Sequence, residues 1–148
     1  MTDHGPMAQT MTKDERLAFL ATGTRTAKLA TVRTDGRPHV APVWFVVDGE
    51  DIVLTTGVGT VKARNMAADD RVCLCVDDEV PPFGFVVVQG RATLSGDPAE
   101  LRDWAGRIGG RYMGEDRAEE FGARNGVPGE LLVRIKPERV VAESRVAD

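Results

Sequence analysis

Lys62 and Arg64 follow a loop rich in glycine and threonine, and this combination of residues can bind an anion. The loop, residues 55–60, holds two glycines and three threonines and follows a predicted strand. We expect a helix to begin with Thr60 as its N-cap, and the free N–H groups and dipole of a helix start attract phosphate. Hydroxyls and two cations strengthen that attraction. The sequence therefore predicts a phosphate cradle; the alternative is that Lys62 and Arg64 are solvated surface charges.

The familiar combinations of catalytic side chains are missing from the sequence. The histidines are His4 and His39, and no Gly-x-Ser-x-Gly segment surrounds a serine. His39 follows a proline in a predicted strand, which is more typical of a half-exposed structural histidine than of a general base. The loop before Lys62 lacks the Walker A pattern, which argues against a nucleoside triphosphatase. The catalytic residues are thus unknown, and an enzyme built on this chain would leave the difficult step to a cofactor.

Cys73 and Cys75 are one residue apart in a predicted strand, so their side chains share a face. This close spacing argues against a disulfide between them. A metal site would need further ligands, and the histidines lie far away in sequence. We therefore expect no metal site and interpret both cysteines as small, buried apolar side chains.

The composition is that of an ordinary globular protein with one domain. The chain has 148 residues, of which 42 % are hydrophobic and 28 % charged, and its net charge of −4 does not favour nucleic-acid binding. No apolar run approaches the ~20 residues of a membrane helix, and the N-terminus lacks the features of a signal peptide. We expect a cytoplasmic protein with no membrane partner. Residues 1–11 predict a flexible tail, and residues 12–148 predict the single domain.

The elements that would position the cradle are short strands joined by tight turns. Asp35-Gly36 and Asp48-Gly49 are turn signals, because glycine readily adopts the positive φ that hairpins need. Predicted strands cover residues 26–33, 38–47, 52–56, 72–76 and 85–94, and a last strand region covers 131–135 and 139–146 with a break or bend near Pro137. Predicted helices cover 13–21, 60–68 and 116–125, and another begins at Asp97 and weakens at Gly109-Gly110. This pattern predicts a mainly β fold: an antiparallel barrel of six or more strands with about four short helices.

Two residues inside predicted strands indicate irregular backbone. Pro42 cannot donate to a strand ladder, so it predicts an edge, a bulge or a break. It could expose backbone groups to a flat polar heterocycle, or it could protect an edge strand from aggregation. Gly90 predicts a bulge or a close approach of another backbone.

Short motifs occur in a fixed order along most of the chain. They are Leu29-Ala30-Thr31-Val32, Asp35-Gly36-Arg37-Pro38-His39-Val40-Ala41-Pro42-Val43-Trp44, Thr55-Thr56-Gly57, Lys62-Ala63-Arg64-Asn65, Asp69-Asp70-Arg71-Val72 and Val88-Gln89-Gly90-Arg91-Ala92. Their order and spacing resemble the flavin/deazaflavin oxidoreductase superfamily, the FMN-binding-like split β-barrel proteins related to pyridoxamine 5′-phosphate oxidase. Within it, the sequence looks most like the actinobacterial branch that uses coenzyme F420, an 8-hydroxy-5-deazaflavin.

The resemblance implies an F420-dependent oxidoreductase that transfers a hydride from reduced deazaflavin to a conjugated small-molecule acceptor. It also implies a homodimer with cofactor sites at its interface. By motif position, the cofactor-binding residues would be Lys62, Arg64, Thr55, Thr56 and Asn65 at the phosphate, Val40, Ala41, Pro42 and Val43 along the ring, and Phe83 from the other subunit.

Two other functions stay open on the same residues. One is an FMN-dependent oxidoreductase of the pyridoxamine phosphate oxidase-like class, and the other is a non-catalytic carrier or sensor of flavin or deazaflavin. Trp44 is interpreted as a core residue. Arg107, Arg111 and Tyr112 could meet an anionic ligand or form a plain surface helix. No motif identifies the physiological substrate.

Overall fold

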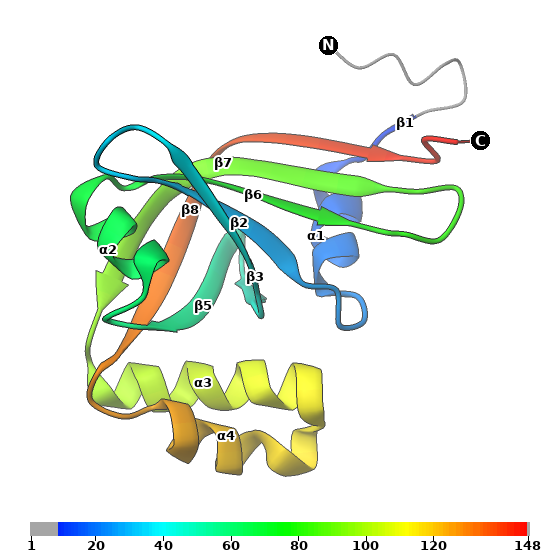
Figure 1. Ribbon diagram of the computed structural model, residues 1–148. Coiled ribbons are helices and arrows are strands. Elements are labelled where there is room, and N and C mark those ends of the chain that lie inside the picture. The colour runs from blue at the N-terminus through cyan, green and yellow to red at the C-terminus, as the bar shows by residue number, and fades with distance from the viewer. Residues whose placement is uncertain (1–8, 148) are drawn as a thin grey trace.

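The computed structural model describes residues 9–147, which form one antiparallel sheet curled around its core (Figure 1). The strands are β1 Gln9–Thr10, β2 Ala27–Val32, β3 Pro38–Val43, β4 Val46–Asp48, β5 Asp51–Gly57, β6 Arg71–Asp77, β7 Phe85–Ser95 and β8 Glu130–Ser144. Their order across the sheet is β3-β2-β6-β7-β8-β5-β4, and β1 pairs with the end of β8. The predicted mainly β, antiparallel fold is confirmed.

Four α-helices accompany the sheet within the described part of the chain. They are α1 Lys13–Ala21, α2 Val61–Ala68, α3 Pro98–Met113 and α4 Ala118–Asn125, with a short 3₁₀ turn Glu115–Arg117 before α4. Thr12, Thr60 and Asp97 cap the first three, each accepting a hydrogen bond from a backbone N–H in the first turn. Thr12 and Glu15 form a capping box. The predicted starts of α1, α2 and α3 are confirmed, whereas α4 begins at Ala118 rather than at residue 116.

The predicted strand 38–47 is wrong, because the chain leaves the sheet at Trp44 and Phe45. Side chains of α3 bind both backbone polar groups of Phe45: Tyr112 accepts from its N–H, and Arg111 donates to its carbonyl. These contacts replace the ladder that a continuous strand would need. β3 lies at one edge of the sheet and pairs in regular register with β2, so of the three alternatives for Pro42 the structure shows the edge.

Neither Pro137 nor Gly109-Gly110 divides its element into two. β8 runs unbroken from Glu130 to Ser144, and a register shift beside Gly90 accommodates Pro137 in the neighbouring strand. Gly90 is needed there, because a Cβ would collide with the Lys136 carbonyl, which confirms the predicted close approach. α3 continues to Met113 because α4 packs closely against its glycines: a Cβ on Gly109 would collide with the Phe121 side chain.

The domain begins earlier than predicted. Gln9–Thr10 pair with β8, and the Met11 side chain is buried, so residues 9–11 belong to the fold. Residues 1–8 of the predicted tail lie outside the described residues.

The main core lies inside the curled sheet. Its largest fully buried side chains include Phe45, Leu29, Ile52, Leu54 and Leu74. A smaller cluster of Val53, Leu101 and Leu132 fastens α3 to the outside of β5 and β8. Among residues 9–147, none of the helices combines the length and apolar composition needed to cross a membrane.

Candidate functional site

A cleft of about 350 Å³ lies where the ends of β3 and β5 and the start of α2 meet α3. Figure 1 shows α3 and α4 beneath β3 and β5. β3 and β5 are not paired with each other in the described part of the chain, so their ends leave room for a ligand. The lining residues are Pro42, Val43, Trp44, Thr55, Thr56, Gly57, Thr60, Lys62, Ala105, Ile108, Gly109, Asn125 and Glu130.

Half of the predicted cofactor-binding residues line this cleft. They are Pro42, Val43, Thr55, Thr56 and Lys62. They come from β3, β5 and the first turn of α2. Their contact with a cofactor stays a prediction.

Thr60 organises the start of α2 at the cleft. Its hydroxyl accepts from the Ala63 N–H at 3.2 Å and donates to the Gly57 carbonyl at 2.9 Å. The Thr56 hydroxyl lies 3.0 Å from the Thr60 oxygen, and because the Thr60 hydrogen is used on Gly57, Thr56 is the donor of that pair. The loop is therefore held in one arrangement before any ligand binds.

Lys62 is a half-buried cation at the cleft. Within residues 9–147, its ammonium group makes no hydrogen bond or ion pair, although it lies in the cleft beside the start of α2. A helix start and an unpaired cation together favour an anion. Arg64 is exposed and does not line the cleft, because residues two apart on a helix face different directions.

The other predicted contacts lie elsewhere in this protomer. Asn65 is buried and donates to the Thr31 hydroxyl at 3.0 Å, so its amide nitrogen holds α2 against β2. Val40 is 65 % exposed on the edge strand, and Ala41 pairs with Leu29. Phe83 is in the loop between β6 and β7, with a positive φ of 61° that is rare for an aromatic residue. None of these four residues lines the cleft.

The interpretation of Trp44 as a core residue is wrong. Its side chain is 39 % exposed and lines the cleft, and its ring stacks on Tyr112. The adjacent Phe45 takes the buried position instead. Sequence periodicity missed this because the apolar run 43–47 gives no sign of the strand break.

Arg111 and Tyr112 do not form a plain surface helix, because their side chains fasten α3 to the barrel. Arg111 donates to the carbonyls of Leu20, Gly23 and Phe45 at 2.7, 3.0 and 2.7 Å. Burial lowers the pKa of its guanidinium and raises the pKa of the Tyr112 hydroxyl. Arg107 makes an exposed ion pair with Asp103.

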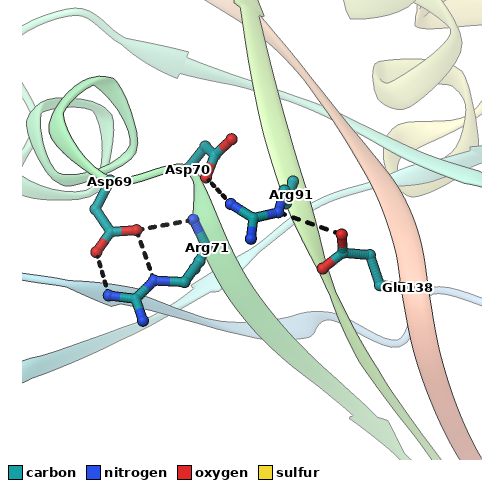
Figure 2. Close-up of polar contacts among 5 residues, drawn as sticks. All are labelled: Asp69, Asp70, Arg71, Arg91 and Glu138. Atoms are coloured by element: carbon teal, nitrogen blue, oxygen red, sulfur yellow. Dashed lines mark hydrogen bonds and ion pairs between the residues drawn. The ribbon is translucent and has the colours of Figure 1, made fainter.

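A larger concavity of about 530 Å³ lies against β2, β6 and β7, but its charges are already paired. Figure 2 shows Arg71 bound to Asp69, and Arg91 bound to Asp70 and Glu138. The side-chain hydrogen bond from Arg71 lowers the pKa of Asp69 to about 2. Because each guanidinium has a carboxylate partner, this concavity is a poorer anion site than the cleft at Lys62.

The acidic residues beside the strands form ion pairs at the protein surface. Asp69 and Asp70 belong to the ion pairs of Figure 2. Asp77 pairs with Lys28 at 3.1 Å and Asp78 with Arg25 at 3.2 Å, which joins the end of β6 to β2 and its preceding loop.

The cysteines are half-buried rather than buried, on the face of β6 that points away from the core. Desolvation raises the pKa of both thiols, which disfavours the reactive thiolate.

His39 is half-exposed, as predicted, and its Nδ1 is buried without a hydrogen-bond partner among the described residues. Within residues 9–147, no three His, Cys, Asp or Glu side chains gather in a way that could hold a metal ion.

Comparison with known sequences decides the family. The protein-family model described as "Pyridoxamine 5'-phosphate oxidase" matches residues 12–143. The chain belongs to the pyridoxamine 5′-phosphate oxidase family. As a member, it is 31 % identical over 147 residues to an F420H(2)-dependent biliverdin reductase from Mycobacterium tuberculosis, covering 96 % of this chain and 97 % of that protein.

Solved structures place this pyridoxamine 5′-phosphate oxidase family member among split β-barrels, which confirms the predicted fold. A conserved hypothetical protein from Mycobacterium tuberculosis is similar, with a TM-score of 0.81 and 26 % identity over 91 % of this chain and 86 % of that one. A protein described as an F420 reductase is also similar, with a TM-score of 0.66 and 26 % identity over 86 % of this chain and 94 % of that one.

Some cleft residues of this family member left little signal in the sequence. Ala105, Ile108 and Gly109 share one helix face, as their i, i+3, i+4 spacing predicts. The spacing does not predict that this face lines a cleft. Asn125 and Glu130 flank a turn rich in glycine, and nothing in that turn points to a ligand. Only the sheet pairing of β8 with β5 brings Glu130 to the cleft.

Proposed function

We propose that this chain is an F420-dependent oxidoreductase that transfers a hydride from reduced deazaflavin to a conjugated small-molecule acceptor. The observation that carries the proposal is Lys62, an unpaired cation at a helix start, in a cleft that also has an apolar wall. Relatives named for F420-dependent reduction support the choice of cofactor. The cleft volume falls within the roughly 300–1,000 Å³ of small-molecule sites.

The cleft residues fit a phosphate joined to a flat ring. Lys62 and the first N–H groups of α2 would hold the phosphate, while Thr56 and Thr60 keep the loop in place. Pro42 and Val43, at the end of an edge strand, would present backbone groups to the ring. Trp44 and Ile108 supply apolar surface that excludes water. A bound reduced deazaflavin would supply the hydride, so the chain needs no acid or base of its own.

We also propose a homodimer that shares its cofactor sites, with Phe83 contributed by the partner. Strand register places Val40, Ala30 and Cys73 in one row on the outer face of the sheet. Lys28 lies in a second row with Pro42, Cys75, Val87 and Val141, and its charge is paired with Asp77. Apart from Lys28, these side chains give that face an apolar surface suited to a second copy. A charge introduced at Val141 should give a folded monomer with lost cofactor binding; binding retained in a true monomer would refute the shared site.

Two other functions use the same cleft. FMN also joins a phosphate to a tricyclic ring, so an FMN-dependent oxidoreductase would need no different residues. A non-catalytic carrier or sensor would bind its ligand through the same residues.

A fluorescence titration with F420 and, separately, with FMN tests the proposal. Micromolar or tighter binding of F420 with weak binding of FMN is expected, and the reverse preference would favour the flavin alternative. Reduced F420 should then be oxidised by an added conjugated acceptor, with biliverdin first because of the relative that reduces it. Binding without oxidation above the rate of the free cofactor would favour the carrier.

A further inference from the structure

Glu130 places a carboxylate in the same cleft as Lys62. It is the first residue of β8 and pairs with Gly57, the last residue of β5. Its side chain lies over that glycine: a Cβ added to Gly57 would be 3.2 Å from Glu130 Oε2. The carboxylate therefore occupies space that is open because residue 57 has no side chain.

The Glu130 carboxylate is unpaired among the described residues. It is half-buried, and across residues 9–147 it makes no hydrogen bond or ion pair. Arg134, on the same strand, is already bound to Asp48 and Asp51 at 2.8 and 3.2 Å. Lys62 lines the same cleft, yet the two charges form no ion pair. Partial burial of an unpaired carboxylate is unfavourable, so a donor from a ligand would stabilise it.

We propose that Glu130 is a specificity-determining residue that accepts hydrogen bonds from hydroxyl groups of the bound molecule, beside the phosphate held by Lys62. The inference rests on the proposed function, because a deazaflavin or flavin cofactor carries a polyol chain between its ring and its phosphate. An ionised carboxylate is only an acceptor, so it selects for O–H donors and against a second anionic group. Acidic residues recognise the ribose hydroxyls of dinucleotides by the same physics.

The contrary interpretation makes an opposite prediction. If the ligand placed only its phosphate near Glu130, the carboxylate would repel it, and removing the charge would tighten binding. The sign of the change in affinity in Glu130→Gln therefore separates the two.

The test compares F420 with the phosphate-free deazaflavin that ends in the ribityl chain, by fluorescence titration. Glu130→Gln is expected to weaken binding of both by a similar factor, about tenfold. Lys62→Ala is expected to weaken binding of F420 much more than binding of the phosphate-free compound. Glu119→Gln, an exposed acid on α4 outside the cleft, controls for the change in net charge.

Glu130→Asp keeps the charge but withdraws it by one methylene, so it should bind both compounds less well than wild type if position matters. It also provides the measurement if Glu130→Gln fails to fold. Unchanged or tighter binding by a folded Glu130 variant would overturn the role of Glu130 while leaving the cofactor assignment intact. Failure of the wild type to bind either deazaflavin would overturn the proposed function and this inference together.

Discussion

The rings of Trp44 and Tyr112 lie face to face, with centroids 4.9 Å apart and planes 4° from parallel. The Tyr112 hydroxyl donates to the Arg25 carbonyl at 2.8 Å and accepts from the Phe45 N–H at 3.2 Å. One residue of α3 thus fixes both the backbone after β3 and the aromatic wall of the cleft. The helix hairpin outside the barrel is therefore a structural part of the candidate site.

Tyr112→Phe should lower the free energy of unfolding by about 1–3 kcal/mol, because the Phe45 N–H and the Arg25 carbonyl lose their partner while the ring stack remains. Urea unfolding, followed by far-UV circular dichroism, measures the change. Tyr112→Leu, which also removes the stack, should cost more. Equal stability of Tyr112→Phe and wild type would mean that water replaces the hydroxyl at no cost.

Lys62→Ala should weaken F420 binding by about 1–3 kcal/mol if Lys62 makes a charge-assisted contact with phosphate. Lys136→Ala is the matched control, because Lys136 is exposed on β8 and does not line the cleft. Arg64→Ala tests whether Arg64 binds the phosphate, as the motif implies, or lies outside the site, as its absence from the cleft lining indicates. A loss at Arg64 as large as that at Lys62 would place the phosphate on the outer side of α2.

Asn65→Ala should destabilise the fold by about 1–3 kcal/mol, because the buried Thr31 hydroxyl loses its donor. In a double-mutant cycle by urea unfolding, adding Thr31→Val should cost little more, since the two residues act as one contact. Additive losses would show that each side chain has a separate role. A cofactor titration of folded Asn65→Ala then distinguishes structural support from direct contact with phosphate.

Asp69 should make stability depend on pH in the acid range. Its carboxylate is held by Arg71, and its pKa falls from 3.8 to about 2 on folding, so the folded state favours the ionised form. The contribution of Asp69 to the free energy of unfolding is complete above the ordinary pKa of 3.8, and it is lost as the pH falls through about 2. Asp69→Asn should therefore be less stable than wild type at pH 7 and equal to it near pH 2. High salt should reduce the difference at neutral pH, because the pair is exposed.

Gly109→Ala should destabilise the protein by about 1–3 kcal/mol, since the new methyl group collides with Phe121 and separates α4 from α3. Gly96→Ala is the matched control: a Cβ there meets nothing within 4 Å, and little change in thermal stability is expected. A tolerated Gly109→Ala would show that the helix pair can spread without loss.

Local signals in the sequence predicted the starts of α1, α2 and α3, because a cap is a contact between residues three apart, as in Thr12 and Glu15. The break at Trp44-Phe45 could not be predicted, since the contacts that cause it come from Arg111 and Tyr112, far along the chain. Helical geometry could have separated Lys62 from Arg64, because residues two apart do not share a face. Glu130 had no such signal: it reaches the cleft only through strand pairing.

β3 and β4 occupy opposite edges of the sheet, yet only Trp44 and Phe45 separate them in the chain. Within the described residues the barrel is thus closed here by covalent backbone and side-chain contacts, not by a hydrogen-bonded ladder. Small outward motions of β3 at this seam can widen the cleft without breaking a strand pair. A bulky ring can therefore enter at the expense of contacts such as the aromatic stack, while the sheet that holds the fold together stays intact.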